Sequence, residues 1–153
     1  MKAIVVTPPS SLIEVPSGYK SIFLAGSIGD TKIDWQQEVI NSVKDFKKVI
    51  FNPRREGWDN SWDNSIENQK FKEQVDWELE HLEKADKVIM NLVPETMSPI
   101  SLLEFGLYAR SGKLVVYCPN SFWRKGNIDV TCQRYHIPQV EKFEELITLI
   151  KYF

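Results

Sequence analysis

The feature that most constrains the fold of this chain is a series of five short apolar runs. They are KAIVV (2–6), SIFLAGS (21–27), KVIFNP (48–53), DKVIMNLV (86–93) and KLVVYCP (113–119). The runs are rich in β-branched residues and are bounded by Pro, Gly or Asn, which is typical of strands. Continuous apolar character indicates strands that are covered on both faces. The runs therefore predict a buried, five-stranded sheet.

Helical patterns separate most of these runs. Apolar residues recur at helical spacing over residues 33–46, 65–84 and 99–111, and again near 141–152. Strands that alternate with helices predict an α/β fold, with a mostly parallel sheet between two layers of helices. We expect a doubly wound, Rossmann-like or flavodoxin-like architecture, in a single domain that spans residues 1–153. Ligands of such folds bind beyond the carboxyl ends of the strands.

The charge and residue content argue against several classes of function. The net charge is −2 with both signs interspersed, so neither nucleic acid nor a membrane surface is expected as the main partner. Cys118 and Cys132 are too isolated for a disulfide framework, and His81 and His136 lie far apart in the sequence. No apolar run approaches the ~20 residues that span a membrane, and no signal peptide is recognisable. These observations predict a soluble, cytoplasmic protein with no metal or cofactor.

An acidic residue stands out in the helical stretch SPISLLEFGLYARSGK (98–113). On a helical wheel Glu104 falls on the face of Ile100, Leu103 and Leu107. The opposite side is also apolar, so we expect the helix to be buried nearly all round. The positions three and four residues from Glu104 hold no cation, which excludes a local ion pair. A carboxylate buried without such a partner is costly and points to a function.

A second acidic residue repeats this pattern on the preceding helix. Glu78 falls between Phe71, Val75 and Leu82 on the wheel of residues 65–84. A structural reading pairs Glu78 with His81 or a backbone group. However, the helices of Glu78 and Glu104 flank the same predicted strand, which favours a shared site. Paired carboxylates suit cleavage of a glycosidic bond, where one attacks or stabilises the anomeric carbon and the other moves protons.

The loops at the predicted strand ends contain further candidates. The turn LAGSIG (24–29) holds Gly26 and Ser27, whose backbone and hydroxyl groups either face a polar ligand or simply form a tight turn. The segment lacks the spacing of dinucleotide and P-loop fingerprints. Arg54 and Arg55 follow the strand 48–53 and suit either an anion or a solvated or inter-subunit position.

The long loop over residues 53–64 exceeds a usual connection, which indicates a lid or a subunit contact. It contains Trp58 and Trp62, and a further tryptophan, Trp123, follows the last predicted strand. Tryptophans in such loops suit either stacking on a nucleobase or packing within an oligomer. The sequence leaves both readings open.

From residue 21 to about residue 130 the chain resembles the nucleoside 2-deoxyribosyltransferase family and its relatives. The segments that carry the resemblance are, in chain order, IFLAGSI, NPRR, QVDWELEHLEKADKVIMNL, SPISLLEFGLYARSGK and CPNSFWRKGNID. The LLEFG…SGK segment is similar to the family's stretch around its catalytic glutamate. Because several motifs occur in the family's order, the resemblance is more specific than any one motif.

The resemblance implies roles for individual residues. Glu104 matches the nucleophile that forms a covalent 2-deoxyribosyl intermediate, and Glu78 matches an acid that assists proton transfer to the departing base, where transferases usually carry Asp. Ser98 falls where many transferases have another Asp, whereas related deoxynucleoside monophosphate N-hydrolases tend to have Ser, used toward the phosphate. Asn127, with Asn120 as the competing candidate, looks like the sugar-binding Asn that neighbouring subunits contribute to each other's sites.

The remaining predicted substrate-binding residues also follow from the resemblance. Gly26 and Ser27 match the first-strand loop that borders the sugar pocket, and the NPRR segment contributes Asn52 and Arg54. The implied partners are a small deoxynucleoside or deoxynucleotide and a free nucleobase. A homo-oligomer, dimeric or larger, with shared active sites is implied as well.

Three functions are consistent with these residues. The first is a nucleoside 2-deoxyribosyltransferase, in which a second base replaces the departing one on the sugar. The second is a 2′-deoxynucleoside 5′-monophosphate N-hydrolase, in which water replaces the acceptor base and Ser27, Arg54, Arg55 and Ser98 favour a phosphate. The third is a non-catalytic nucleotide-binding module, in which binding survives loss of Glu104 and no bond is cleaved. A hydride-transferring oxidoreductase is disfavoured because the dinucleotide fingerprint is missing.

Overall fold

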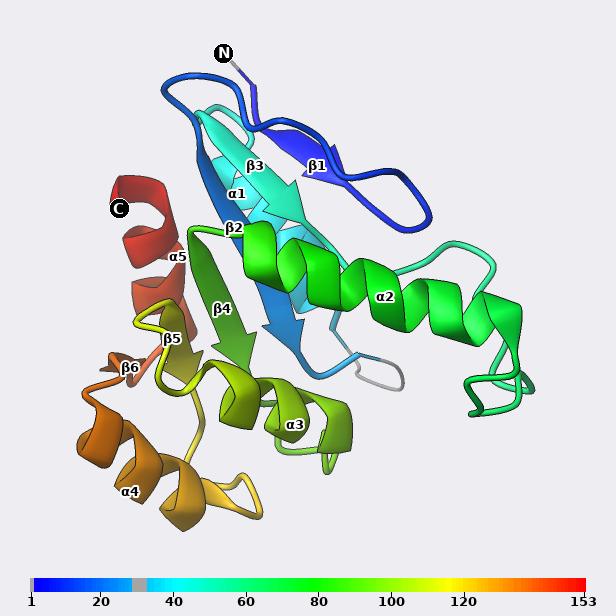
Figure 1. Cartoon of the computed structure of the whole chain (residues 1–153). Coiled ribbons are helices and arrows are strands. Elements are labelled where there is room, and N and C mark those ends of the chain that lie inside the picture. The colour runs from blue at the N-terminus through cyan, green and yellow to red at the C-terminus, as the bar shows by residue number, and fades with distance from the viewer. Residues whose placement is uncertain (1, 29–32) are drawn as a thin grey trace.

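The computed structural model describes residues 2–28 and 33–153. Within these ranges the elements follow one another in an α/β order (Figure 1). They are β1 (Ile4–Val6), β2 (Lys20–Gly26), α1 (Trp35–Val43), β3 (Lys48–Phe51), α2 (Gln69–Lys84), β4 (Lys87–Asn91), α3 (Pro99–Tyr108), β5 (Leu114–Tyr117), α4 (Lys125–Tyr135), β6 (Gln139–Val140) and α5 (Phe143–Tyr152).

The described strands form one sheet in the order β1-β3-β2-β4-β5-β6. Every pairing is parallel. Without β1 this is the flavodoxin-like order, and β1 extends the sheet beyond β3 as an edge strand. The predicted α/β class and parallel sheet are therefore confirmed. The predicted strand number is wrong, since the sheet has six strands rather than five.

Two apolar cores lie on the two faces of the sheet, because successive side chains of a strand point to opposite faces. In β2, Phe23 and Ala25 belong to the core under α2, α3 and α4, whereas Ile22 and Leu24 belong to the core under α1 and α5. Figure 1 shows these two helical layers in front of and behind the sheet. The continuous apolar runs of the sequence arise from this double coverage.

Two elements were not predicted from the sequence, α4 and β6. The α4 segment buries only Ile128 and Cys132, so its apolar periodicity is too sparse to recognise. β6 consists of only two residues, which extend the sheet beside Val116 and Tyr117 of β5. No helix among residues 2–28 and 33–153 combines the length and apolar character needed to cross a membrane.

The expectation that the helix of Glu104 is buried all round is wrong. In α3, Phe105 and Ala109 pack into the core, whereas Ile100, Leu103 and Leu107 are 57%, 59% and 57% exposed. The helix therefore has one buried face and one apolar face that no described residue covers.

The carboxyl ends of β2 and β4 approach each other too closely for a side chain to lie between them. Gly26 pairs with Asn91 in the sheet, and Ser27 donates its N–H to the Asn91 carbonyl over 3.0 Å. Gly26 has a φ of +126°, and a Cβ placed there would lie 2.1 Å from the Asn91 carbonyl oxygen. Only glycine fits this position. The strand order reverses between β2 and β4, which is where doubly wound folds bind ligands.

Candidate active site

A cavity of about 1150 Å³ opens at the carboxyl ends of β2 and β3, between α2, α3 and the loop after β3. It brings together most of the site residues that the sequence predicts, from segments far apart in the chain. Those that line it are Gly26, Ser27, Asn52, Arg54, Glu78, Ser98 and Glu104. Gly29, the last residue of the predicted turn, lies outside the described residues.

Glu104 lies on α3 and is only 8% exposed, yet its side chain lines the cavity. Burial penalises the charged carboxylate and raises its pKa to about 8, and the nearby negative charge of Glu78 adds to this rise. The two carboxyl groups therefore interact electrostatically, although they come from different helices. A buried carboxyl group beside a second one keeps its proton to higher pH than an isolated carboxyl group does.

Glu78 lies on α2 and is half-buried. Its Oε1 accepts a hydrogen bond of 2.8 Å from Nε2 of Gln74, one helical turn earlier. Burial raises the pKa of Glu78, and the hydrogen bond from Gln74 opposes this rise. The structural reading of Glu78 as a partner of His81 is not borne out, because the His81 Nδ1 lies 2.7 Å from the Trp77 carbonyl oxygen instead.

The apolar stripe that surrounds Glu78 on the helical wheel also faces the cavity. Phe71, Val75 and Leu82 line it together with Glu78. An apolar wall beside a carboxyl group favours the protonated, neutral form. The wall therefore adds to the burial that raises the pKa of Glu78.

Hydroxyl groups connect the two loops at the base of the cavity. The Oγ atoms of Ser27 and Ser98 lie 2.5 Å apart. The backbone N–H of Val93 donates to the Ser27 Oγ over 2.9 Å, and the Thr96 Oγ1 lies 3.1 Å from the Ser98 Oγ. This network joins the end of β2 to the segment between β4 and α3.

Ser98 has an unusual backbone conformation at the start of α3. Its φ is +50° and ψ is +53°, and its side chain does not cap the helix. Non-glycine residues rarely adopt this left-handed region, and the following Pro99 restricts Ser98 further. Strain of this kind is often retained at functional sites. The N-terminus of α3, where backbone N–H groups lack intrahelical partners, adjoins the cavity through Ser98 and Pro99.

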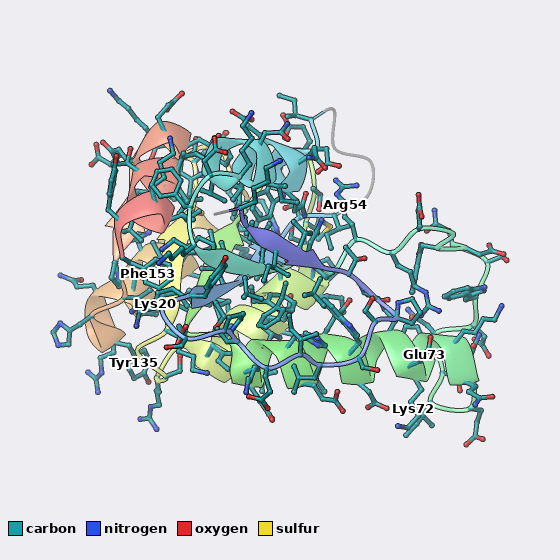
Figure 2. The ribbon with its side chains drawn as sticks, turned by 90° about the horizontal axis from the view of Figure 1, so that it is seen from above. Lys20, Arg54, Lys72, Glu73, Tyr135 and Phe153 are labelled. Atoms are coloured by element: carbon teal, nitrogen blue, oxygen red, sulfur yellow. The ribbon has the colours of Figure 1, made fainter. Side chains whose placement is uncertain are left out.

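Arg54 is held at the cavity by two residues around the start of α1. Its Nε donates to the Gln36 Oε1 over 3.0 Å and lies 3.2 Å from the Asp34 carboxylate. Figure 2 shows Arg54 beside α1, across from Lys72 and Glu73 near the start of α2. Asn52 supports the same turn, since its Oδ1 accepts the backbone N–H of Arg54 over 3.2 Å.

Sequence reasoning missed Gln36, which is fully buried. Its Nε2 donates to the Ser27 carbonyl over 3.4 Å, while its Oε1 accepts from Arg54. Gln36 therefore links the loop after β2 to the loop after β3. A neutral amide on an amphipathic helix produces no conflict of polarity, so the sequence carried no signal for it.

The other arginine of the loop, Arg55, is held by protein groups. It forms an ion pair of 2.7 Å with Glu73 and lies over the Trp62 ring at 5.4 Å. Trp62 in turn contacts Trp58 edge-to-face, with ring centroids 4.9 Å apart. Of these two tryptophans, Trp58 lines the cavity. The loop is thus fastened to α2 and presents Trp58 at the cavity wall.

Asn127 is not brought to this cavity. It lies on the exposed side of α4 and is absent from the described lining. Asn120, the competing candidate, is exposed in the loop before α4. Trp123, in the same loop, donates its Nε1–H to the Met97 carbonyl over 3.0 Å, which joins this region to the segment before α3.

Residues 19–122 match a family model described as "Nucleoside 2-deoxyribosyltransferase like". No curated protein matches the sequence. Among solved structures, a conserved protein from Enterococcus faecalis matches with a TM-score of 0.60 at 14% identity, over 86% of this chain and 97% of that chain. At this identity the structural likeness shows the fold alone.

Proposed function

The chain belongs to the nucleoside 2-deoxyribosyltransferase-like family, and from this membership and the site geometry we propose that it cleaves the N-glycosidic bond of 2′-deoxynucleosides. The sugar then passes to a second base. The observation that carries the proposal is that Glu104 and Glu78 line one cavity and are electrostatically coupled. Two carboxyl groups that share protons are the equipment for a double displacement at an anomeric carbon.

The reactive form carries the proton on Glu78, although burial raises the pKa of Glu104 to about 8. In the first displacement, a carboxylate oxygen of the ionised Glu104 attacks C1′ of the deoxyribose. The C1′–N bond breaks, and its electron pair goes to the departing base. Glu78 gives its proton to the base, so the base leaves neutral and Glu78 becomes a carboxylate. The products are a deoxyribosyl ester on Glu104 and a free base.

In the second displacement, an acceptor base enters the emptied part of the cavity. Its ring nitrogen attacks C1′ and its proton passes to Glu78. The ester C1′–O bond breaks, which regenerates the Glu104 carboxylate and the protonated Glu78. Two displacements at C1′ give net retention of configuration.

The test is chromatography of the protein with each common 2′-deoxynucleoside, alone and with a second free base. We expect a new deoxynucleoside with the wild type and with Glu83→Gln, an exposed control on α2, but not with Glu104→Gln. Mass spectrometry of the wild type without acceptor should find one deoxyribosyl unit on Glu104. Binding without any bond cleavage in the wild type would leave only the non-catalytic module.

A second candidate, hydrolysis of 2′-deoxynucleoside 5′-monophosphates, is favoured by one observation. Ser98 lies at the N-terminus of α3, and its hydroxyl oxygen lies 2.5 Å from that of Ser27. A phosphate is bound well by hydroxyl groups, a helix N-terminus and Arg54. An acidic side chain at position 98 would repel it. Release of free base from the 5′-monophosphate, unaffected by an acceptor base, would establish this function over transfer.

The proposed assembly is a homo-oligomer that completes the site. The exposed Ile100, Leu103 and Leu107 line the cavity mouth, where a second copy would cover them. Asn127, exposed on α4, would then reach the neighbour's cavity. We expect a dimer or larger species in sedimentation, and a monomer for Leu103→Glu.

Mixing two inactive variants tests the shared site directly. Glu104→Gln and Asn127→Ala each remove one component from every site of a homodimer. A heterodimer of the two would contain one site with both native residues. Recovery of activity once the subunits have exchanged supports the shared site, whereas heterodimers that form and remain inactive contradict it.

A further inference from the structure

Gln74 occupies a position that the proposed chemistry does not yet use. It is on α2, is only 4% exposed and lines the cavity. Its Nε2 donates two hydrogen bonds, one of 3.0 Å to the Pro53 carbonyl and one of 2.8 Å to the Glu78 Oε1. Both amide hydrogens are therefore used, and they connect the end of β3 to the acid of the site.

The two acceptors fix the orientation of the Gln74 amide. Turning it by half a rotation would place its own oxygen against the Pro53 carbonyl and the Glu78 carboxyl oxygen. In the observed orientation the Gln74 Oε1 is buried and has no hydrogen-bond partner among the described residues. A buried acceptor without a partner destabilises a fold. The two hydrogen bonds that the amide donates, to Pro53 and to Glu78, therefore explain why a glutamine occupies this position.

The orientation of Gln74 in turn determines the state of Glu78. A protonated carboxyl group accepts hydrogen bonds best through its carbonyl oxygen, so the oxygen that Gln74 holds is the one without the proton. We propose that Gln74 is a positioning residue that keeps the Glu78 Oε1 as an acceptor and assigns the transferable proton to Oε2. This inference rests on the proposed function, in which Glu78 gives that proton to the departing base.

The bond from Gln74 also affects how readily Glu78 holds its proton. It opposes the rise in the pKa of Glu78 that burial causes. Removing the donor should therefore raise the pKa of Glu78 further while releasing its carboxyl group from a fixed orientation. A glutamine that served only the Pro53 carbonyl would change neither property.

The first experiment uses Gln74→Met, with Gln69→Met as the control at the exposed first residue of the same helix. The substrates are 2′-deoxyguanosine and 7-methyl-2′-deoxyguanosine, as nucleosides and 5′-monophosphates. The methylated base is already cationic and leaves without a proton from the protein. We expect kcat of Gln74→Met to fall about 10- to 100-fold on the first substrate, with KM little changed, and to stay near wild type on the second.

The pH profile of Gln74→Met should also move toward higher pH relative to wild type. Equal losses on both substrates, or an unshifted profile, would show that Gln74 only supports the fold and would overturn the inference. Absence of turnover by the wild type on any deoxynucleoside or 5′-monophosphate is a different result, which overturns the proposed function.

A second measurement uses wild-type protein alone and needs neither a substrate nor a variant. In wild-type protein the side-chain ¹⁵N signal of Gln74 and the carboxyl ¹³C signal of Glu78 should titrate together, because one hydrogen bond joins them. A Gln74 signal that stays constant while Glu78 titrates would overturn the inference whatever the enzyme activity proves to be.

Discussion

The hydroxyl oxygens of Ser27 and Ser98 lie 2.5 Å apart, although 71 positions separate these residues in the sequence. The contact joins the end of β2 to the start of α3, and α3 carries Glu104. Val93 adds a third point, because its N–H donates to the Ser27 Oγ. These hydroxyl groups thus connect the turn beside the proposed sugar pocket to the helix of the proposed nucleophile.

Replacing Ser98 by Asp tests what this hydroxyl pair binds. Ser98→Asp adds a negative charge beside Ser27, which should repel a phosphate. We expect the KM for a 2′-deoxynucleoside 5′-monophosphate to rise about tenfold or more, while the KM for the nucleoside changes little. Ser98→Ala, which removes the hydroxyl without adding charge, is the control. A loss of the same size for both substrates would exclude a phosphate at this position.

Glu104→Gln should increase stability in alkaline solution. Folding raises the pKa of Glu104 from its ordinary value of 4.5 to about 8, so the native state keeps a proton that the unfolded chain releases. The wild type therefore loses stability as the pH rises through this window. Glutamine does not ionise. We therefore expect the free energy of unfolding of the variant, relative to wild type, to be about 1–3 kcal/mol larger at pH 9 than at pH 4.

Urea unfolding at the two pH values measures this difference. Glu83→Gln, which changes an exposed glutamate of α2, should show little such gain. If Glu104→Gln and wild type differ by the same amount at both pH values, Glu104 ionises normally in the folded protein.

The activity should show a bell-shaped pH dependence. The reactive form holds one proton between Glu78 and Glu104, and burial raises the pKa of both. We expect kcat/KM to rise at a pH above the range in which glutamate ordinarily titrates, where the pair loses its first proton. It should fall near pH 8, where the pair loses its second proton. Measurement from pH 4 to 10 would test this, and a rate that is constant over that range would contradict the shared proton.

His81 should make the fold sensitive to acid. It is fully buried and its ring stacks on Trp77 at 3.8 Å, and burial lowers its pKa. The unfolded chain then binds a proton more readily, so stability is lost as the pH falls below the ordinary value of 6.5. We expect the melting temperature of wild type to fall by about 2–4 °C relative to His81→Phe between pH 7 and pH 5. His136→Gln, at an exposed position, should follow wild type.

Two glycine substitutions near the site should have opposite effects. At Gly26 an added Cβ would meet the Asn91 carbonyl oxygen at 2.1 Å, whereas at Gly106 in α3 it would meet nothing within 4 Å. Gly26→Ala should therefore destabilise the protein by about 3 kcal/mol or more. Gly106→Ala should stabilise it by about 0.5–1 kcal/mol. Denaturant melts of both variants provide the comparison, and similar effects at the two positions would contradict this account.

The sequence predicted the sheet better than its surroundings. All five expected strands are present, because strands covered on both faces leave unbroken apolar runs. The α3 prediction failed in part, since a helical wheel records polarity and not coverage, and Leu103 is exposed although its side chain is apolar. The polar α4 segment has too few buried positions to be recognised from its periodicity.

Charge decides which residues of the candidate site could be predicted from the sequence. Glu104 and Glu78 could be found because a carboxylate on an apolar stripe is out of place. Gln36 and Gln74 could not, because an uncharged amide fits either a solvated or a buried position. Their partners, Arg54 and Pro53, are 18 and 21 positions away, and only the folded chain brings such residues together.

The fit of Gly26 against Asn91 restricts how this cavity can diverge. At that point its wall is main chain, so no substitution can deepen or fill it without parting β2 from β4. The loop that carries Trp58 and the exposed face of α3 have no such restriction, since side chains form them. A change in what the cavity binds would therefore arise at its mouth, while the dimensions of the end beside Gly26 are inherited with the sheet itself.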